Sequence, residues 1–365
     1  MAFERNRVSI SARRKLVSIA LAIVIFAALA GLATLALRRP VEYGISNAIL
    51  TGIGVGLFEE FYVQTLRGRW LRSMHPLRSV LVYTAVVSAI YLIALHITHL
   101  ILGHWNELPL IYRRLPQALP MFVGFSVVGI GVIRVVHFIG AGNLFHLMVG
   151  TYHRPVAKRV VLMFVDMNGS TAIAGRLGAV KMSSLVGKFL FDIAKPITDG
   201  GGDIYLYKGD GLIAVWDWDE AIRNNAVLRA IDATFTAVRR EQAAYLSQFG
   251  VVPKFRVGVH GGDVVVSEQG DTRRSIGVYG DTINIAARME DAAKTRGVAC
   301  IISGDIAAAL DNRSERIRPL AEETIRGLKD PILICEYRPD GERGIAPADS
   351  ASADAIATGR TSRSD

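Results

Sequence analysis

The strongest constraint on the fold is a stretch of 22 residues, Leu16 to Leu37, that contains no charged side chain. As an α-helix it is long enough to cross a hydrocarbon layer about 30 Å thick. Two further apolar runs of similar length are Val80–Leu102 and Ala118–Ile139, and a weaker, glycine-rich one is Ile45–Val63. The first run is longer than the apolar part of a signal peptide and lacks a clear cleavage site. The pattern therefore predicts an α-helical membrane domain with four spans.

The distribution of charge predicts how these spans are oriented. Residues 1–159 contain 17 Lys/Arg and 5 Asp/Glu, whereas residues 160–365 contain 25 and 28. The net charge of +9 therefore comes from the apolar half, which argues against a nucleic-acid-binding surface. Basic residues gather before the first span, between the second and third, and after the fourth. By the positive-inside rule both termini are cytoplasmic, so we expect a multi-pass protein of the inner (cytoplasmic) membrane whose partner is the lipid bilayer.

Four segments follow from these patterns. We expect a transmembrane domain at 1–139, a helical connector at 140–158, a soluble domain at 159–339 and a disordered tail at 340–365. Pro155 ends any helix that continues from the last span. The tail is rich in Ala, Ser, Asp, Gly and Arg and has no hydrophobic period. The connector is suited to signal transfer or dimer contact, and a simple tether explains it as well.

The soluble half opens with a strand, a turn and a helix. Val160–Val165 is a continuous apolar run typical of a buried strand, and Ala172–Leu177 has a helical pattern. Asp166 stands at the end of the strand. Its carboxylate is a ligand type that Mg²⁺ prefers, and the backbone N–H groups of the following turn can bind phosphate. An ordinary strand–turn–helix unit has the same pattern.

A β-hairpin is predicted next, with Ile204–Tyr207 and Leu212–Trp216 on either side of a Lys-Gly-Asp-Gly turn. Asp210 at its tip is a common turn residue. If the hairpin pairs with the first strand, Asp210 becomes a second metal ligand beside Asp166. Two carboxylates that share two metal ions suit in-line displacement at phosphorus. Gly201-Gly202-Asp203 resembles the diguanylate cyclase signature but precedes the strand, so we do not assign it that role.

A later helix, predicted from Gly280-Asp281-Thr282 to about Arg296, carries Asn284 and Arg288. Residues four apart share one face of a helix and can act on one ligand. Strands are expected before it at Phe255–His260 and at Val264–Val266.

Together these pieces resemble the catalytic domain of class III adenylate and guanylate cyclases. The resemblance covers about residues 155–339, and its stretches are FVDMNGSTAIAGRLG at 164–178, YKGDGLIAVW at 207–216, VGVHGGDVVV at 257–266 and YGDTINIAARME at 279–290. It implies an α+β ferredoxin-like domain with βααββαβ order, working as a homodimer with its sites between subunits. It also implies formation of cyclic AMP or cyclic GMP, and we predict conversion of ATP to 3′,5′-cyclic AMP and pyrophosphate.

The resemblance assigns roles residue by residue. Two Mg²⁺ or Mn²⁺ ions per site are implied, held by Asp166, Met167 and Asp210. The partner subunit supplies Asn284 for the ribose and Arg288 for the transition state. The expected phosphate-binding positions are Asn168, Gly169, Ser170, Thr171, Lys208 and Lys329, the last displaced by one place from the family's lysine.

Base choice is left open by the sequence. The family's base-selecting positions fall at Leu206 and Gly277, where adenylate cyclases usually have Lys and then Asp or Thr. Neither residue here can read a base, so Lys208, on the same strand face as Leu206, is a candidate to reach the pocket. The alternatives are a guanylate cyclase and a retired cyclase-like signalling or scaffold protein. The presence of all four of Asp166, Asp210, Asn284 and Arg288 favours an enzyme.

The sequence does not identify a ligand or partner of the membrane domain. Four histidines, His96, His99, His137 and His146, lie in or near the third and fourth spans. Paired histidines between helices can hold haem. Hydrogen bonding between helices is the favoured alternative, because His96 and His99 share one helix and the other two lie nearer the opposite side of the membrane.

Overall fold

The chain forms two compact units, Met1–Thr151 and Tyr152–Asp365. The computed structural model describes residues 10–36, 41–63, 74–103, 150–271, 275–310, 316–323 and 331–340, with single positions and short pieces between 68 and 131. Lys329, His137, His146 and the tail after Asp340 lie outside the described residues, as does most of the predicted span Ala118–Ile139.

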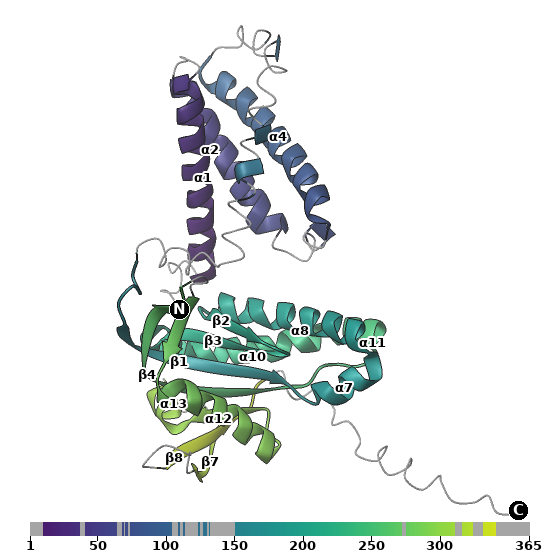
Figure 1. The fold of residues 1–365 in the computed structure, drawn as a ribbon, viewed down its shortest axis with the longest axis vertical. Coiled ribbons are helices and arrows are strands. Elements are labelled where there is room, and N and C mark those ends of the chain that lie inside the picture. Colours follow the sequence, from purple (N-terminus) through teal and green to yellow (C-terminus); the bar gives the residue numbers. More distant parts are fainter. Residues whose placement is uncertain are drawn as a thin grey trace, which may run out of the picture. The chain divides into compact units, whose positions relative to one another are not determined.

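The N-terminal unit is helical (Figure 1). Its long helices are α1 (Ile10–Ala36), α2 (Val41–Phe58) and α4 (Pro76–Ile101), and α2 continues as the π-helix η1 (Glu59–Val63). These elements coincide with the first three predicted spans. Among the described residues one helix, Arg78–Ile101 with a mean hydropathy of 2.2, is long and apolar enough to cross a membrane. The four-span arrangement therefore stays a prediction.

The glycines of the weak span allow the helices to pack closely. A Cβ at Gly52 would lie 2.6 Å from the Cα of Ile23, and one at Gly56 would lie 3.1 Å from the Cα of Ile19. Both contacts join α2 to α1. Small residues at such positions let helix backbones approach each other, so these two glycines serve the helical unit itself.

The π-helix carries the two acidic residues of the weak span. Glu59 and Glu60 are 8% and 5% exposed, and Tyr83 of α4 donates a hydrogen bond of 3.2 Å to Oε2 of Glu59. π-Helical turns occur mostly as short insertions within α-helices and frequently mark functional positions. This turn ends α2 with its carboxylates inside the helical unit.

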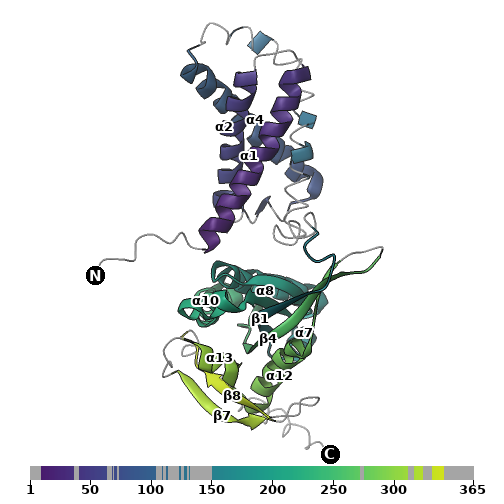
Figure 2. The ribbon, with the colours of Figure 1, turned by 90° about the vertical axis from the view of Figure 1, so that its left-hand side faces the viewer.

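The second unit is a mixed sheet with helices on both faces (Figures 1 and 2). The strand order is β2-β3-β1-β4-β6-β8-β7, and β5 pairs with β4. Among the strand pairs of the described residues, β4–β6 alone is parallel. In chain order the elements are β1 (Val156–Met167), α7 (Ser170–Leu177), α8 (Ala179–Asp199), β2 (Asp203–Lys208), β3 (Gly211–Asp217), α9 (Trp218–Ile222), η4 (Arg223–Asn225), α10 (Ala226–Arg240), α11 (Gln242–Phe249), β4 (Phe255–Gln269), β5 (Ser275–Tyr279), α12 (Asp281–Arg296), β6 (Cys300–Ser303), α13 (Gly304–Ala309), β7 (Ile317–Glu323) and β8 (Ile332–Tyr337).

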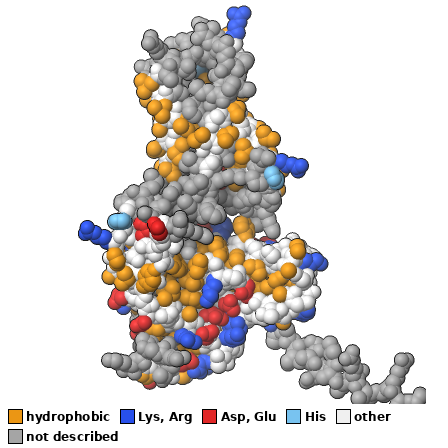
Figure 3. All heavy atoms as spheres, in the orientation of Figure 1, with side chains coloured by type: hydrophobic (Ala, Val, Ile, Leu, Met, Phe, Trp, Pro, Cys, Tyr) orange, Lys and Arg blue, Asp and Glu red, His pale blue; other side chains and the backbone are white. Residues whose placement is uncertain are grey.

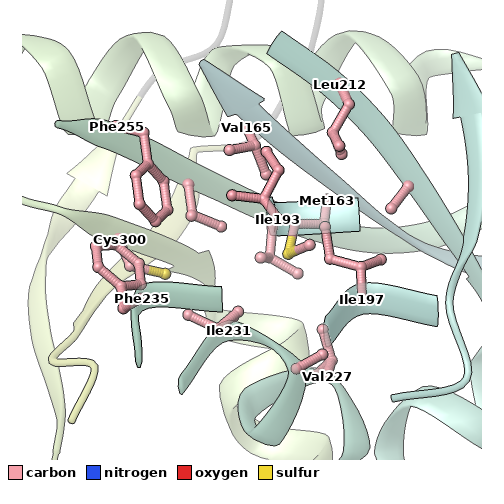
Figure 4. Packing of buried hydrophobic residues seen from close by; sticks show 14 of the residues in the cluster. Met163, Val165, Ile193, Ile197, Leu212, Val227, Ile231, Phe235, Phe255 and Cys300 are labelled. Atoms are coloured by element: carbon pink, nitrogen blue, oxygen red, sulfur yellow. The ribbon is translucent and has the colours of Figure 1, made fainter. Parts of the chain in front are cut away.

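The main hydrophobic core lies between the sheet and helices α8 and α10 (Figure 4). Met163 and Val165 of β1 point into it beside Ile193 of α8 and Ile231 of α10. The opposite face of the sheet is covered by α12 through Ala286 and Met289. Because side chains alternate along a strand, β1 contributes to both layers. Burial on both faces fixes β1 as a central strand, with Asp166 near its end.

Two parts of the predicted layout are wrong. The connector was expected to be helical through residue 158, but β1 begins at Val156 and the described residues before it form turns. The two strands predicted at Phe255–His260 and Val264–Val266 are one strand, β4. Gly261 and Gly262 do not break it. A Cβ at Gly261 would lie 2.5 Å from the Trp218 ring, and one at Gly262 would lie 2.8 Å from Oγ1 of Thr282.

A buried ionic cluster ties α8 to the segment around α11. Lys188, 4% exposed, donates to Asp192 at 2.7 Å and to Glu241 at 2.8 Å. Tyr245 donates to the same Asp192 oxygen at 2.6 Å. Buried charges are tolerated where they are paired and hydrogen-bonded in this way. The cluster therefore completes the helical layer and lies apart from the predicted metal ligands.

Candidate active site

The structure brings Asp166 and Asp210 together at the junction of β1 with the β2–β3 hairpin. β3 pairs with β1 so that Leu212 lies opposite Val165. Gly209 has a φ of +60°, which the two-residue turn requires. A Cβ at Gly211 would lie 2.2 Å from the carbonyl oxygen of Val165 and 3.2 Å from the Cα of Asp166. Only glycine at position 211 lets the turn lie this close to β1.

The electrostatics of this junction favour a cation. Burial, together with the neighbouring carboxylates of Asp210 and Glu290, raises the pKa of Asp166 to about 6. Oδ2 of Asp210 is shielded from solvent and has no hydrogen-bond partner in the described part of the chain. Hard divalent cations bind such oxygen atoms. The described residues contain no cluster of three or more side chains of the kinds that hold metals, so the site rests on these two carboxylates.

The turn after Asp166 leaves fewer free amides than the sequence indicates. The backbone N–H of Asn168 donates to the carbonyl of Lys254 at 2.7 Å and so is not available to a phosphate. Gly169, with a φ of +65°, is the N-cap of α7, and Ser170 and Thr171 lie in the first turn of that helix. Those three residues keep the predicted position at a helix N-terminus. Because the side chain of Met167 is 1% exposed in the core, only its main chain can contribute to a metal site.

Sequence reasoning missed an ion pair beside the metal ligands. Arg256 of β4 lies directly opposite Asp166 in the β1–β4 ladder. Its Nη2 is 3.8 Å from Oδ2 of Asp166, and its Nε donates to Glu290 at 3.2 Å. The guanidinium lowers the pKa of Asp166, as does Lys294 of α12, against the stronger effect of burial. The signal in the sequence is Arg256 itself, a basic residue inside an otherwise apolar strand. Its partner Glu290, however, is 34 residues away in the chain.

Asn284 and Arg288 lie on a different face of α12 from Glu290 and Lys294. Both are exposed, and Arg288 pairs with Asp291 at 3.4 Å. Within the described chain neither makes a hydrogen bond or ion pair with Asp166 or Asp210. Gly258 lets α12 lie close to β4, because a Cβ there would be 2.2 Å from the backbone nitrogen of Glu290. In the described chain Asn284 and Arg288 are therefore exposed on α12, without a contact to Asp166 or Asp210.

Of the remaining predicted binding positions that the structure describes, Lys208 and Leu206 are exposed and Gly277 is buried. Lys208 is exposed at the end of β2, and Leu206 is 49% exposed. Gly277 lies in β5 opposite Ser267. β2 and β5 meet where the backbone N–H of Val278 donates to the hydroxyl of Tyr205 at 3.1 Å. Tyr205 precedes Leu206 and Val278 follows Gly277, so each predicted base-selecting position lies one residue from this contact between β2 and β5.

Two histidines of the helical unit, His96 and His99, make hydrogen bonds. His96 donates through Nδ1 to the Leu92 carbonyl and accepts through Nε2 from the Tyr112 hydroxyl, each at 2.6 Å. His99 is 2% exposed and lies 2.8 Å from the Leu95 carbonyl through Nδ1. Because both ring nitrogens of His96 are occupied, these contacts favour the hydrogen-bonding interpretation of His96 over haem ligation.

Comparison with known proteins agrees with this geometry. Residues 153–334 match the family model described as the adenylate and guanylate cyclase catalytic domain. Adenylate cyclase 2 of Rhizobium meliloti (strain 1021) is 32% identical over 204 residues, 56% of this chain and 56% of the relative. Adenylate cyclase 1 of the same organism is 25% identical over 278 residues, 69% of this chain and 41% of the relative. The chain thus spans about half the length of these relatives.

Among solved structures, a bacterial light-regulated adenylyl cyclase superposes with a TM-score of 0.52. The match has 14% sequence identity and covers 61% of this chain and 65% of the other. At this identity the likeness concerns the fold alone.

Proposed function

Through residues 153–334 the chain belongs to the adenylate and guanylate cyclase catalytic domain family, and from that membership we propose that it is a membrane-anchored adenylate cyclase. It converts ATP to 3′,5′-cyclic AMP and pyrophosphate at the interface of a homodimer. The observation that carries the proposal is the convergence of Asp166 and the shielded Oδ2 of Asp210 at one strand junction.

The residues of this chain divide the work between binding and charge stabilisation. The amides at the start of α7 bind outer phosphate oxygens. Asn284 of the partner subunit orients the ribose so that its 3′-oxygen faces the α-phosphorus. Arg288 of the partner subunit meets the negative charge that develops on the α-phosphoryl oxygens as pyrophosphate departs. Arg256 holds Asp166 in position from the neighbouring strand.

Two divalent cations, held by Asp166, Asp210 and the main chain of Met167, would lower the pKa of the 3′-hydroxyl and neutralise the triphosphate. We expect chelation of the purified full-length protein with EDTA to abolish cyclic AMP formation and added Mg²⁺ or Mn²⁺ to restore it. Ca²⁺ at the same concentration is the control ion, since it prefers more ligands at longer distances. Unchanged turnover in EDTA would rule out the metal-dependent mechanism.

The homodimer is supported by the two faces of α12. Glu290 and Lys294 lie on the side of the subunit's own Asp166, whereas Asn284 and Arg288 face outward. A site that needs both sets of residues is completed by a second copy of the chain. Two-fold symmetry then produces two equivalent sites.

Membrane anchoring is supported by the surface of the N-terminal unit. Many large apolar side chains of its helices are exposed (Figure 3), among them Val24, Leu32, Leu81, Ile93 and Ile101 at 60–71%. Exposed apolar surface on this scale is typical of a membrane or protein interface. The chain is proposed to lie in the inner membrane with its catalytic domain in the cytoplasm.

Fusions to alkaline phosphatase, which is active only outside the cytoplasm, test this topology. Fusions after Arg39 and after Trp105 should be active, and fusions after Met74 and after Tyr152 should be inactive, because basic segments stay inside. Immunoblots for equal expression provide the control. Activity after Tyr152 would contradict a cytoplasmic catalytic domain.

A further inference from the structure

The base-selecting position at Gly277 is covered by a side chain from the neighbouring strand. A Cβ at Gly277 would lie 2.6 Å from Nε2 and 2.9 Å from Cδ of Gln269. It would also lie 2.8 Å from Cε2 of Tyr279. The carboxamide of Gln269 therefore occupies the space that a larger residue at position 277 would fill. Glycine at this position makes room for a polar group supplied by β4.

The strand register explains how Gln269 reaches this place. In the β4–β5 pair, Ser267 lies opposite Gly277, Gln269 opposite Ser275 and Val265 opposite Tyr279. Gln269 and Tyr279 are thus the two diagonal neighbours of the Ser267–Gly277 pair on one face of the sheet. With no side chain at Gly277 between them, the Tyr279 hydroxyl donates directly to Oε1 of Gln269.

This hydrogen bond leaves Gln269 with a defined orientation. Oε1 keeps one lone pair beyond the one used by Tyr279, and Nε2 points over Gly277. Gln269 is exposed and Tyr279 is 45% exposed, so both groups are accessible to a ligand. Leu206 on β2 and Gly277 on β5 each lie one residue from the Tyr205–Val278 hydrogen bond, and Leu206 is apolar and 49% exposed.

We propose that Gln269 is the residue that selects adenine, with Tyr279 as a positioning residue. The inference rests on the proposed cyclase function. Adenine presents its N6 amino donor beside a ring-nitrogen acceptor, and a carboxamide complements both, as it does in Gln–adenine pairs in DNA recognition. Guanine has an acceptor at position 6, so it needs the carboxamide turned over. That turn would replace the hydrogen bond that Oε1 accepts from the Tyr279 hydroxyl by one from Nε2 to the hydroxyl oxygen, so the observed hydrogen bond corresponds to the adenine-reading orientation.

The test compares ATP with GTP as substrates of purified full-length protein. Gln269→Ala should lower the ratio of kcat/KM for ATP to that for GTP by about tenfold, the loss expected for a hydrogen bond to the base. Gln269→Glu should invert the preference, because a carboxylate accepts from the N1 and N2 donors of guanine. Tyr279→Phe should lower the preference for ATP over GTP by a smaller factor, because the carboxamide of Gln269 is still present. Gln248→Ala, at an exposed glutamine on α11, should leave it unchanged.

A double variant provides a rescue. In Gln269→Ala/Gly277→Asp the new carboxylate at position 277 of β5 fills the space that the Gln269 carboxamide leaves. The preference for ATP over GTP should therefore return. Gly277→Asp alone should reduce turnover of both nucleotides, because its Cβ meets Nε2 of Gln269.

Binding of 3′-deoxy-ATP and 3′-deoxy-GTP, which lack the attacking hydroxyl, separates base selection from turnover. If the wild-type protein is active and neither Gln269→Ala nor Gln269→Glu changes its ratio of kcat/KM for ATP to that for GTP, the inference is overturned. The cyclase function would be left standing. A wild-type preference for GTP, or an equal loss with both nucleotides in Gln269→Ala, would overturn the inference too. A protein without turnover that still prefers 3′-deoxy-ATP through Gln269 would overturn only the cyclase function.

Discussion

Asp166→Ala and Asp210→Ala are each expected to reduce cyclic AMP formation by at least about a hundredfold, because each removes one of the two carboxylates that would hold the metals. Both side chains lie at the same junction, where Oδ2 of Asp210 lacks any hydrogen-bond partner in the described chain. Initial rates with saturating Mn²⁺ measure the loss. Gln248→Ala, remote on α11, is the matched control and should be fully active.

The melting temperature separates loss of a metal ligand from loss of the fold. The pKa of Asp166 is raised from 3.8 to about 6, so without metal the folded state holds its proton more tightly than the unfolded state. Stability of the metal-free protein therefore falls as the pH rises from about 4 to 6 and stays lowered above that range. Asp166→Asn removes this penalty, so in EDTA at pH 7.5 its melting temperature should equal or exceed that of the wild type. A large decrease in the melting temperature of Asp166→Asn would contradict the assignment of Asp166 as a metal ligand that is not needed for the fold.

Mixing two inactive variants, Asp210→Ala and Arg288→Ala, should restore activity. In a heterodimer one site combines both substitutions, and the other combines the intact Asp210 of one chain with the intact Arg288 of its partner. Random pairing makes half of the dimers heterodimers, so about one quarter of wild-type activity is expected for an isologous dimer. The reason is the outward position of Arg288, which among the described residues pairs with Asp291.

A second mixture supplies the control. Asp166→Ala with Asp210→Ala places one defect in each site of the heterodimer, so no activity should return. Differently tagged chains purified in tandem verify that heterodimers are present. Recovery in both mixtures, or in neither, would contradict a site shared between subunits.

The sequence predicted the metal junction better than its surroundings. Lys208-Gly209-Asp210-Gly211 is a strong turn signal, so the hairpin with Asp210 at its tip and Asp166 at the end of the first strand could each be placed from local pattern, whereas their proximity depends on the pairing of β3 with β1. The break predicted in β4 came from Gly261 and Gly262. These glycines instead allow Trp218 and Thr282 to approach, which depends on elements distant in the sequence.

Contacts between distant segments explain the other omissions. The pairing of Arg256 with Glu290 joins β4 to α12, and the cover of Gly277 by Gln269 depends on a diagonal position in the β4–β5 ladder. Neither contact can be predicted from the periodicity of hydrophobic residues along the sequence. At the base-selecting positions the sequence showed only that polar residues are missing. The structure shows a polar side chain from the adjacent strand over one of them.

The most direct test of the account is the initial rate of cyclic nucleotide formation by the purified full-length dimer, measured with ATP and with GTP in parallel. Mg²⁺ and Mn²⁺ are supplied in separate reactions. The account predicts cyclic AMP and pyrophosphate in equal amounts, at a higher rate than cyclic GMP. Absence of both cyclic nucleotides with either metal would contradict it.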